Sequence, residues 1–325
     1  MKHFISHNFH RLFNKKHYII LSFVMILVSI FMSIHFSSTH TTKVRIAVVT
    51  EHEDWGEPLE GVQITMMKES PPRSQLVLGQ YDGVIIEQDN GEYGIETIKN
   101  NAFKTMLKEM VENPKSFMVT PEQTRGFGTN VIGYLLMVIL FQSMLFMFVF
   151  AEDIQFKQIE RIAKAPVSLT EYILSHFIAV FILIFVPVLS FLIVAKGILG
   201  LDIGLSLWQY GYLIGVMTIL GVAFAMFIHS LVKGLDTANM VGSSIVILTT
   251  ILSGSFYAFE RGNELFNKIL WVLPQKTFLN FVQNVEEGMG YDTMVFQIMY
   301  VWVVAVCFLM VTIKKIKKDY ILGKS

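Results

Sequence analysis

Six long apolar segments, unevenly spaced, constrain this chain more than any other feature of its sequence. The hydrocarbon core of a bilayer is about 30 Å thick, so a spanning helix needs about 20 predominantly apolar residues. The segments that reach this length are Tyr18–Phe36, Gly128–Ala151, Tyr172–Ala195, Leu207–Ile228, Ala238–Ala258 and Thr293–Ile313. A polar stretch, residues 37–126, separates the first segment from the other five. The sequence therefore predicts an α-helical polytopic membrane protein with six spans and one inserted domain.

The composition agrees with a membrane protein. Hydrophobic residues make up 53% of the chain and charged residues only 16%, a balance more apolar than that of average globular proteins. Basic and acidic residues number 26 each, so there is no basic excess that would indicate a nucleic-acid-binding protein. The single cysteine, Cys307, lies in the last apolar segment and excludes an intrachain disulfide.

Charges beside the spans predict one orientation, because Lys and Arg in short loops favour the cytoplasmic side. The side chains that set it are Lys2, Arg11, Lys15 and Lys16 before the first span, Lys157, Arg161 and Lys164 between the second and third, Lys233 between the fourth and fifth, and Lys314, Lys315, Lys317, Lys318 and Lys324 after the sixth. Both termini and the basic tail 314–325 are thus expected in the cytoplasm, and residues 37–126 outside. The first span is longer than the apolar core of a signal peptide and is predicted to be an uncleaved anchor.

Residues 1–17 carry apolar side chains at helical spacing among basic ones, which predicts a cytoplasmic amphipathic interface helix; a disordered basic leader is the alternative.

Residues 37–126 predict a small extracytoplasmic α/β domain. Its expected strands are Lys43–Thr50, Val62–Met67 and Gly83–Glu87, and its expected helix is Ala102–Val111.

Two further features of the inserted region carry predictions. Its acidic residues suit a solvated face better than a metal or peptide site, because no recognised ligand spacing occurs; they include Glu51, Glu53, Asp54, Glu57 and Glu60. The Thr-x-x-Gln spacing of Thr120–Gln123, with Pro121 at the first helical position, predicts that the second membrane helix begins near Pro121 and runs through Ala151.

The loop 152–170, between the second and third spans (128–151 and 172–195), has the most distinctive pattern. Phe156, Ile159 and either Ile162 or Ala163 are expected on one face of a short amphipathic helix over 155–164, surrounded by charged residues. Pro166 would end that helix, and Ser168-Leu-Thr-Glu171 would open the third span as a capping box.

This pattern resembles the permease subunits of ABC-2-type exporters. The matching residues are Glu152, Asp153, Glu160, Arg161, Ala165, Pro166 and Ser168. A second similarity lies in Leu252–Glu260 and Ile269–Pro274, which look like the Gly-rich end of the fifth span and the external half-helices of that family, here placed at 260–292. The chain departs from the family in having Gln158-Ile159 where Gly-Thr is frequent, and Ala258-Phe259 where a Pro often follows.

The resemblance implies a division of labour between subunits. The short helix would be a coupling helix that docks into a separate ATPase subunit, through Phe156, Lys157, Glu160, Arg161, Ala165, Pro166 and Ser168. Two ATPase copies would bind ATP and Mg, and a second permease copy or a paralogue would complete the pore in a bacterial plasma membrane. The chain itself would hold no cofactor and would not be an enzyme. Its ending Gly323-Lys-Ser325 is no phosphate-binding loop, because Lys318 stands where that motif needs Gly.

The cargo is expected to be an amphiphile moving outward, such as a drug, an antimicrobial peptide or a lipid-like molecule. Polar residues in the spans could line its path: Gln142, Ser143, Asn239, Ser243, Thr250 and Ser253. Hydrogen bonding between helices is the favoured alternative for them. A membrane-anchored receptor whose external domain binds a peptide or envelope component is the second hypothesis for the whole chain. An ion-driven transporter ranks last, because internal repeats and membrane carboxylates are lacking.

Overall fold

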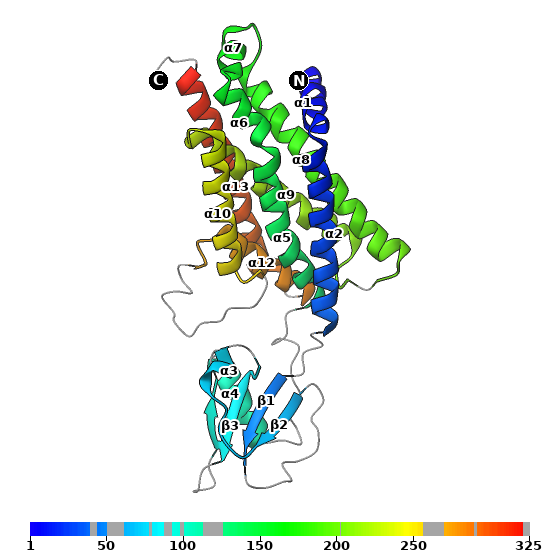
Figure 1. The fold of residues 1–325 in the computed structure, drawn as a ribbon, viewed down its shortest axis with the longest axis vertical. Coiled ribbons are helices and arrows are strands. Elements are labelled where there is room, and N and C mark those ends of the chain that lie inside the picture. The colour runs from blue at the N-terminus through cyan, green and yellow to red at the C-terminus, as the bar shows by residue number, and fades with distance from the viewer. Residues whose placement is uncertain are drawn as a thin grey trace. The chain divides into compact units, whose positions relative to one another are not determined.

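The computed structural model describes residues 1–39, 44–50, 62–77, 80–87, 93–97, 101–112, 126–201, 203–255, 270–288 and 291–320. The chain divides into two compact units (Figure 1). The first, a helical unit, comprises Met1–Ile34, Gly126–Tyr257 and Trp271–Ser325, and the second, the inserted domain, comprises His35–Arg125 and Ala258–Leu270.

The six predicted spans are confirmed as six helices long and apolar enough to cross a membrane. They are α2 (Lys16–Thr39), α5 (Phe127–Phe146) continued by α6 (Phe148–Gln155), α8 (Leu169–Ile193) continued by the π-helical turn η2 (Val194–Ile198), α9 (Leu207–Leu231), α10 (Leu235–Leu252) and α13 (Tyr291–Tyr320). The expected N-terminal amphipathic helix is α1 (Lys2–Asn14), which buries Asn8 and Leu12. Its predicted place at the membrane interface stays a prediction.

Three helix ends differ most from the sequence prediction. The second membrane helix begins at Phe127 and not near Pro121, because Gly126 has extended backbone dihedrals; Thr120–Gln123 lies outside the described residues. Helix α10 ends at Leu252 and not at Ala258, and Gly254 beyond it adopts a left-handed φ of +81°. Helix α13 continues past Ile313 to Tyr320, because Ile316 is buried in the core of the helical unit.

The core of the helical unit forms around α9, which contacts α5, α8 and α13. Ser206 begins this helix with a capping box, in which its hydroxyl accepts from the Gln209 backbone N–H and the Gln209 side chain accepts from the Ser206 N–H. Gly221 lets α5 approach closely, since a Cβ there would lie 2.6 Å from the Ser143 hydroxyl oxygen. Small residues at such crossings are what allows membrane helices to pack without a hydrophobic driving force.

A short helix, α12 (Pro274–Glu286), lies within the predicted half-helix region and packs against α5 and α13. Its last residue, Glu286, accepts hydrogen bonds from the backbone N–H groups of Gly128 (2.6 Å) and Thr129 (2.8 Å), and from the Thr129 hydroxyl (2.6 Å). A Cβ at Gly204, where φ is +81°, would lie 2.6 Å from the Gly128 nitrogen. The Glu286 carboxylate therefore caps the start of α5. The missing side chain at Gly204 leaves the room for this contact.

Within the described residues, the inserted domain is a four-stranded sheet in the order β2-β1-β3-β4, with two helices. Strands β1 (Val44–Val49), β2 (Val62–Met67) and β3 (Gly83–Glu87) are parallel, and β4 (Tyr93–Glu96) pairs antiparallel with β3. The helices are α3 (Arg73–Val77) and α4 (Asn101–Glu112). The three predicted strands and the predicted helix are confirmed, whereas β4 and α3, both very short, were not predicted.

The pattern of α4 explains how this domain forms a core. Phe103, Met106, Leu107 and Met110 recur at helical spacing and pack against Ile46, Val48, Val62 and Ile85 of the sheet. On the other face of the sheet, Ala47 and Val84 are buried together with Leu76 of α3. Successive strand residues point to opposite faces of the sheet, so the strands contribute buried side chains on both faces. The acidic cluster from Glu51 to Glu60 lies outside the described residues, and among those described no group of three side chains suits a metal ion.

We expect Glu286→Ala to destabilise the helical unit, because two N–H groups at the start of α5 and the Thr129 hydroxyl would lose a charged acceptor. Hydrogen bonds to charged groups contribute about 1.5–3 kcal/mol. Glu287→Ala is the matched control, since Glu287 is exposed and, among the described residues, its carboxylate accepts only from Gln283 of the preceding turn. Thermal unfolding of both purified variants tests the cap; equal melting temperatures would contradict it.

Candidate coupling site

The loop 152–170 forms a compact turn between two membrane helices. Helix α6 ends at Gln155, and α7 (Gln158–Lys164) follows after a break at Phe156 and Lys157. Lys157 makes the break by adopting a left-handed φ of 56°. In Figure 1, α7 lies at the end of the helical unit where α1 and the last turns of α13 also lie, which we name the terminal end.

Helix α7 has a buried side and an exposed side. Ile159 is fully buried, and Ile162 and Ala163 are half-buried against the same core. Lys157, Arg161 and Lys164 are exposed. The prediction that Phe156 shares the apolar face of this helix is wrong. The break at Lys157 turns Phe156 away, and 62% of its surface is exposed.

The Glu160 carboxylate accepts a hydrogen bond from Lys164 Nζ at 2.8 Å, one helical turn away. This bond and the Lys164 charge hold the pKa of Glu160 below its ordinary value. A lowered carboxyl pKa means that the pair is intact at neutral pH and is lost only as the pH falls through that lowered value. Arg161 and Lys157 are therefore the cations of α7 that remain outside this pair.

The chain re-enters the helical unit sharply after α7. Ala165 has extended backbone dihedrals, and the Val167 N–H donates to the Ala165 carbonyl at 2.7 Å. Ser168 then caps α8, because its hydroxyl accepts from the Glu171 N–H at 3.4 Å. The predicted N-cap is confirmed, but the predicted capping box is not formed, because the Glu171 carboxylate lies 3.2 Å from the Met1 amino group instead. Pro166 is exposed in this turn, and together with Ala165 it separates α7 from α8 by a short stretch without helix.

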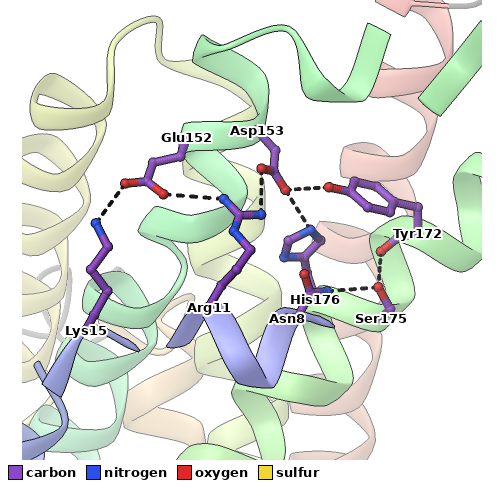
Figure 2. A network of polar contacts seen from close by, with 8 residues as sticks. All are labelled: Asn8, Arg11, Lys15, Glu152, Asp153, Tyr172, Ser175 and His176. Atoms are coloured by element: carbon purple, nitrogen blue, oxygen red, sulfur yellow. Dashed lines mark hydrogen bonds and ion pairs between the residues drawn. The ribbon is translucent and has the colours of Figure 1, made fainter. Parts of the chain in front are cut away.

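A network of polar side chains joins three helices beneath this turn (Figure 2). Its centre is Asp153 of α6, which is fully buried. Arg11 Nη1 of α1 donates to Asp153 Oδ1 at 2.7 Å, and the Tyr172 hydroxyl of α8 donates to Oδ2 at 2.5 Å. His176 Nε2, also on α8, lies 3.0 Å from the same oxygen. One carboxylate thus contacts two neighbouring helices.

Further contacts extend the network along α1. Glu152, next to Asp153, lies 3.4 Å from Arg11 Nη2 and 3.2 Å from Lys15 Nζ. Asn8 Nδ2 donates to the Ser175 hydroxyl at 3.0 Å, and that hydroxyl donates to the Tyr172 carbonyl at 2.6 Å. A buried carboxylate is stable only with partners of this kind. The base of the turn is consequently fixed to α1 as well as to α8.

Sequence reasoning identified half of this network. Glu152 and Asp153 stood out as an acidic pair, but Arg11 and Lys15 were read only as topology signals, and Asn8, Tyr172 and Ser175 were missed. A usable signal was present: an acidic pair that ends an apolar span needs cations, and a basic amphipathic helix is the nearest source at the same predicted side.

The residues predicted to line a path lie on or directly after two helices, α5 and α10, which contact each other. Gln142 and Ser143 are fully buried; Gln142 Nε2 donates to the Ser22 carbonyl of α2, and the Ser143 hydroxyl donates to Ile139 within α5. The other four lie on or directly after α10, where the Ser253 hydroxyl donates to the Thr250 carbonyl and Asn239 and Ser243 are half-buried. Gln142 therefore joins two helices, and the translocation path stays a prediction.

We expect Arg11→Ala to destabilise the protein more than Lys15→Ala. Removing one partner of a buried ion pair costs about 3–5 kcal/mol, and Arg11 is the cation bound to the buried Asp153. Lys15 pairs with the partly exposed Glu152 and lies 4.9 Å above the centre of the Phe148 ring. Exposed ion pairs contribute about 0–1 kcal/mol, and cation–π contacts at exposed sites about 0.5–1 kcal/mol. Arg11→Lys should restore part of the loss, because an ammonium keeps the charge but not the fork geometry. Melting temperatures in detergent test the order; equal losses in both alanine variants would refute it.

Comparisons with known proteins bear on this site. Residues 56–314 match the family described as ABC-2 family transporter protein, and this match covers most of the chain, including α7 and all spans except α2. Comparisons with curated proteins and with solved structures give no match. The six membrane helices, the short helix between the second and third of them, and the family match agree. This chain belongs to the ABC-2 transporter family and is a permease, the non-catalytic membrane component of an ABC transporter.

Proposed function

We propose that this permease exports an amphiphilic molecule, driven by an ATPase subunit that docks on α7. The observation that carries the proposal is the construction of α7: it is anchored by the buried Ile159 and presents Lys157 and Arg161 outward. The exposed Phe156 beside these cations suits a contact that fills a pocket on a partner, since aromatic and Arg side chains dominate interface energetics.

The helices before and after α7 would transmit a force on α7 to the membrane spans. On one side it follows α6, which carries Asp153, and on the other it leads into α8, which carries Tyr172 and His176. Because the polar network joins these two helices and α1, a force on α7 would reach several helices together. Two ATPase copies closing on ATP would rock the membrane helices of two permease copies and open the path outward.

Charge supports the orientation that export requires. The basic residues of α1, α7 and α13 gather at the terminal end of the helical unit, which is the pattern of a cytoplasmic surface. This would place both termini in the cytoplasm of a bacterial cell, and the inserted domain, between α2 and α5 in the chain, outside. An ATPase in the cytoplasm would then have α7 within reach.

We expect Arg161→Glu to abolish ATP-driven transport and capture of the ATPase, while leaving membrane insertion intact. The reversal would put a negative charge where the proposed partner meets a cation. Affinity purification in mild detergent, with the ATPase identified by mass spectrometry and its ATP hydrolysis measured, provides the first readout. Lys104→Glu, an equal charge reversal at an exposed lysine of α4 in the inserted domain, is the control. Full ATPase capture by the Arg161 variant would reject docking through α7.

A further inference from the structure

Helix α7 is too small to hold a partner alone. It has seven residues, and part of its surface is buried in the helical unit. Specific protein interfaces bury about 800 Å² on each side and use about 20–30 residues. If α7 docks an ATPase, as proposed above, the docking surface must extend onto whatever lies beside it at the terminal end.

The neighbour that meets this need is the end of α13, which contacts α7. Ile316 of α13 is buried in the same core as Ile159, and Tyr320 packs against that core. Tyr320 is also close enough to Glu160 for an electrostatic interaction. Figure 1 shows the last turns of α13 at the same end as α7. These contacts make α7 and the end of α13 one continuous surface.

The outward side of this α13 segment is strongly basic. Lys314, Lys317 and Lys318 are exposed, and their i, i+3, i+4 spacing places them on one helical face. Lys315 differs, because its Nζ lies 2.8 Å from Asp319 of the next turn. Among the described residues, none of the three exposed lysines forms an ion pair. Lys157 and Arg161 of α7 add to the same positive charge.

We infer that the end of α13 and α7 together form one basic docking surface for an acidic face of the partner ATPase. The inference rests on the proposed function and adds the second half of the partner-binding surface and its charge. Complementary charge of this kind raises association rates and fixes orientation. Anionic lipid headgroups could also meet lysines after a span. The contact with α7 favours the ATPase, because it joins the lysines to the surface on which the ATPase is proposed to sit.

The test uses the full-length permease in nanodiscs and the ATPase that was identified with the wild-type protein and purified separately. Lys314→Glu/Lys317→Glu/Lys318→Glu should weaken ATPase binding at least tenfold, and the same three changes to Gln should weaken it less. Wild-type affinity should also fall as salt is raised, because exposed charge pairs are screened. Lys68→Glu/Lys104→Glu/Lys108→Glu, on the inserted domain, changes equal charge and should bind normally.

The other outcomes would overturn the inference, and each points to a different explanation. Unchanged binding by both α13 variants, with Arg161→Glu binding lost, would confine docking to α7. Binding that depends on phosphatidylglycerol rather than phosphatidylcholine nanodiscs, and not on the α13 lysines, would assign that surface to lipid. Normal binding by Arg161→Glu together with the α13 variants, or no ATPase with the wild type, would reject the proposed function itself. Equal melting temperatures of the variants and wild type establish that binding, and not folding, has changed.

Discussion

The buried carboxylate of Asp153 is the interaction on which the terminal end of this protein depends. It sits where α6 leaves the membrane core, and contacts with Arg11 and Tyr172 bring α1 and α8 to the same point. A charge in that position is costly unless all of its partners are present. The need to pair this carboxylate therefore holds the three helices together, and the loop 152–170 between α6 and α8 begins and ends at helices joined by this network.

A second carboxylate performs a similar task elsewhere in the helical unit. Glu286 ends α12 and caps the first turn of α5, close to Gly204, whose missing side chain makes the approach possible. Asp153 lies on α6, which continues α5 after Met147. The second membrane span is thus held at both ends by buried or half-buried carboxylates. Motion driven from α7 would act on a span whose ends are both tied to neighbouring helices.

The fold also explains how so short a helix as α7 is held in place while part of it stays exposed. Ile159 anchors α7 in the core, the break at Lys157 frees Phe156 to face outward, and Ile316 brings the end of α13 alongside. Apolar contacts fix the position of the surface, and the exposed cations supply its charge. Under the proposed function this division would be useful, because the proposed docking residues could bind a partner without disturbing those that hold the helix in place.

The sequence by itself determined the six spans, the inserted α/β domain and the family, because apolar length, strand alternation and the Glu-Arg/Ala-Pro-x-Ser loop are local patterns. It could not determine the left-handed turn at Lys157, which a non-glycine residue rarely adopts, and so misplaced Phe156. Nor could it pair Arg11 with Asp153 or Glu286 with Gly128, which lie 142 and 158 residues apart. Only the tertiary structure decided those contacts. A charge can be buried at low cost only where a helix distant in sequence places a partner beside it.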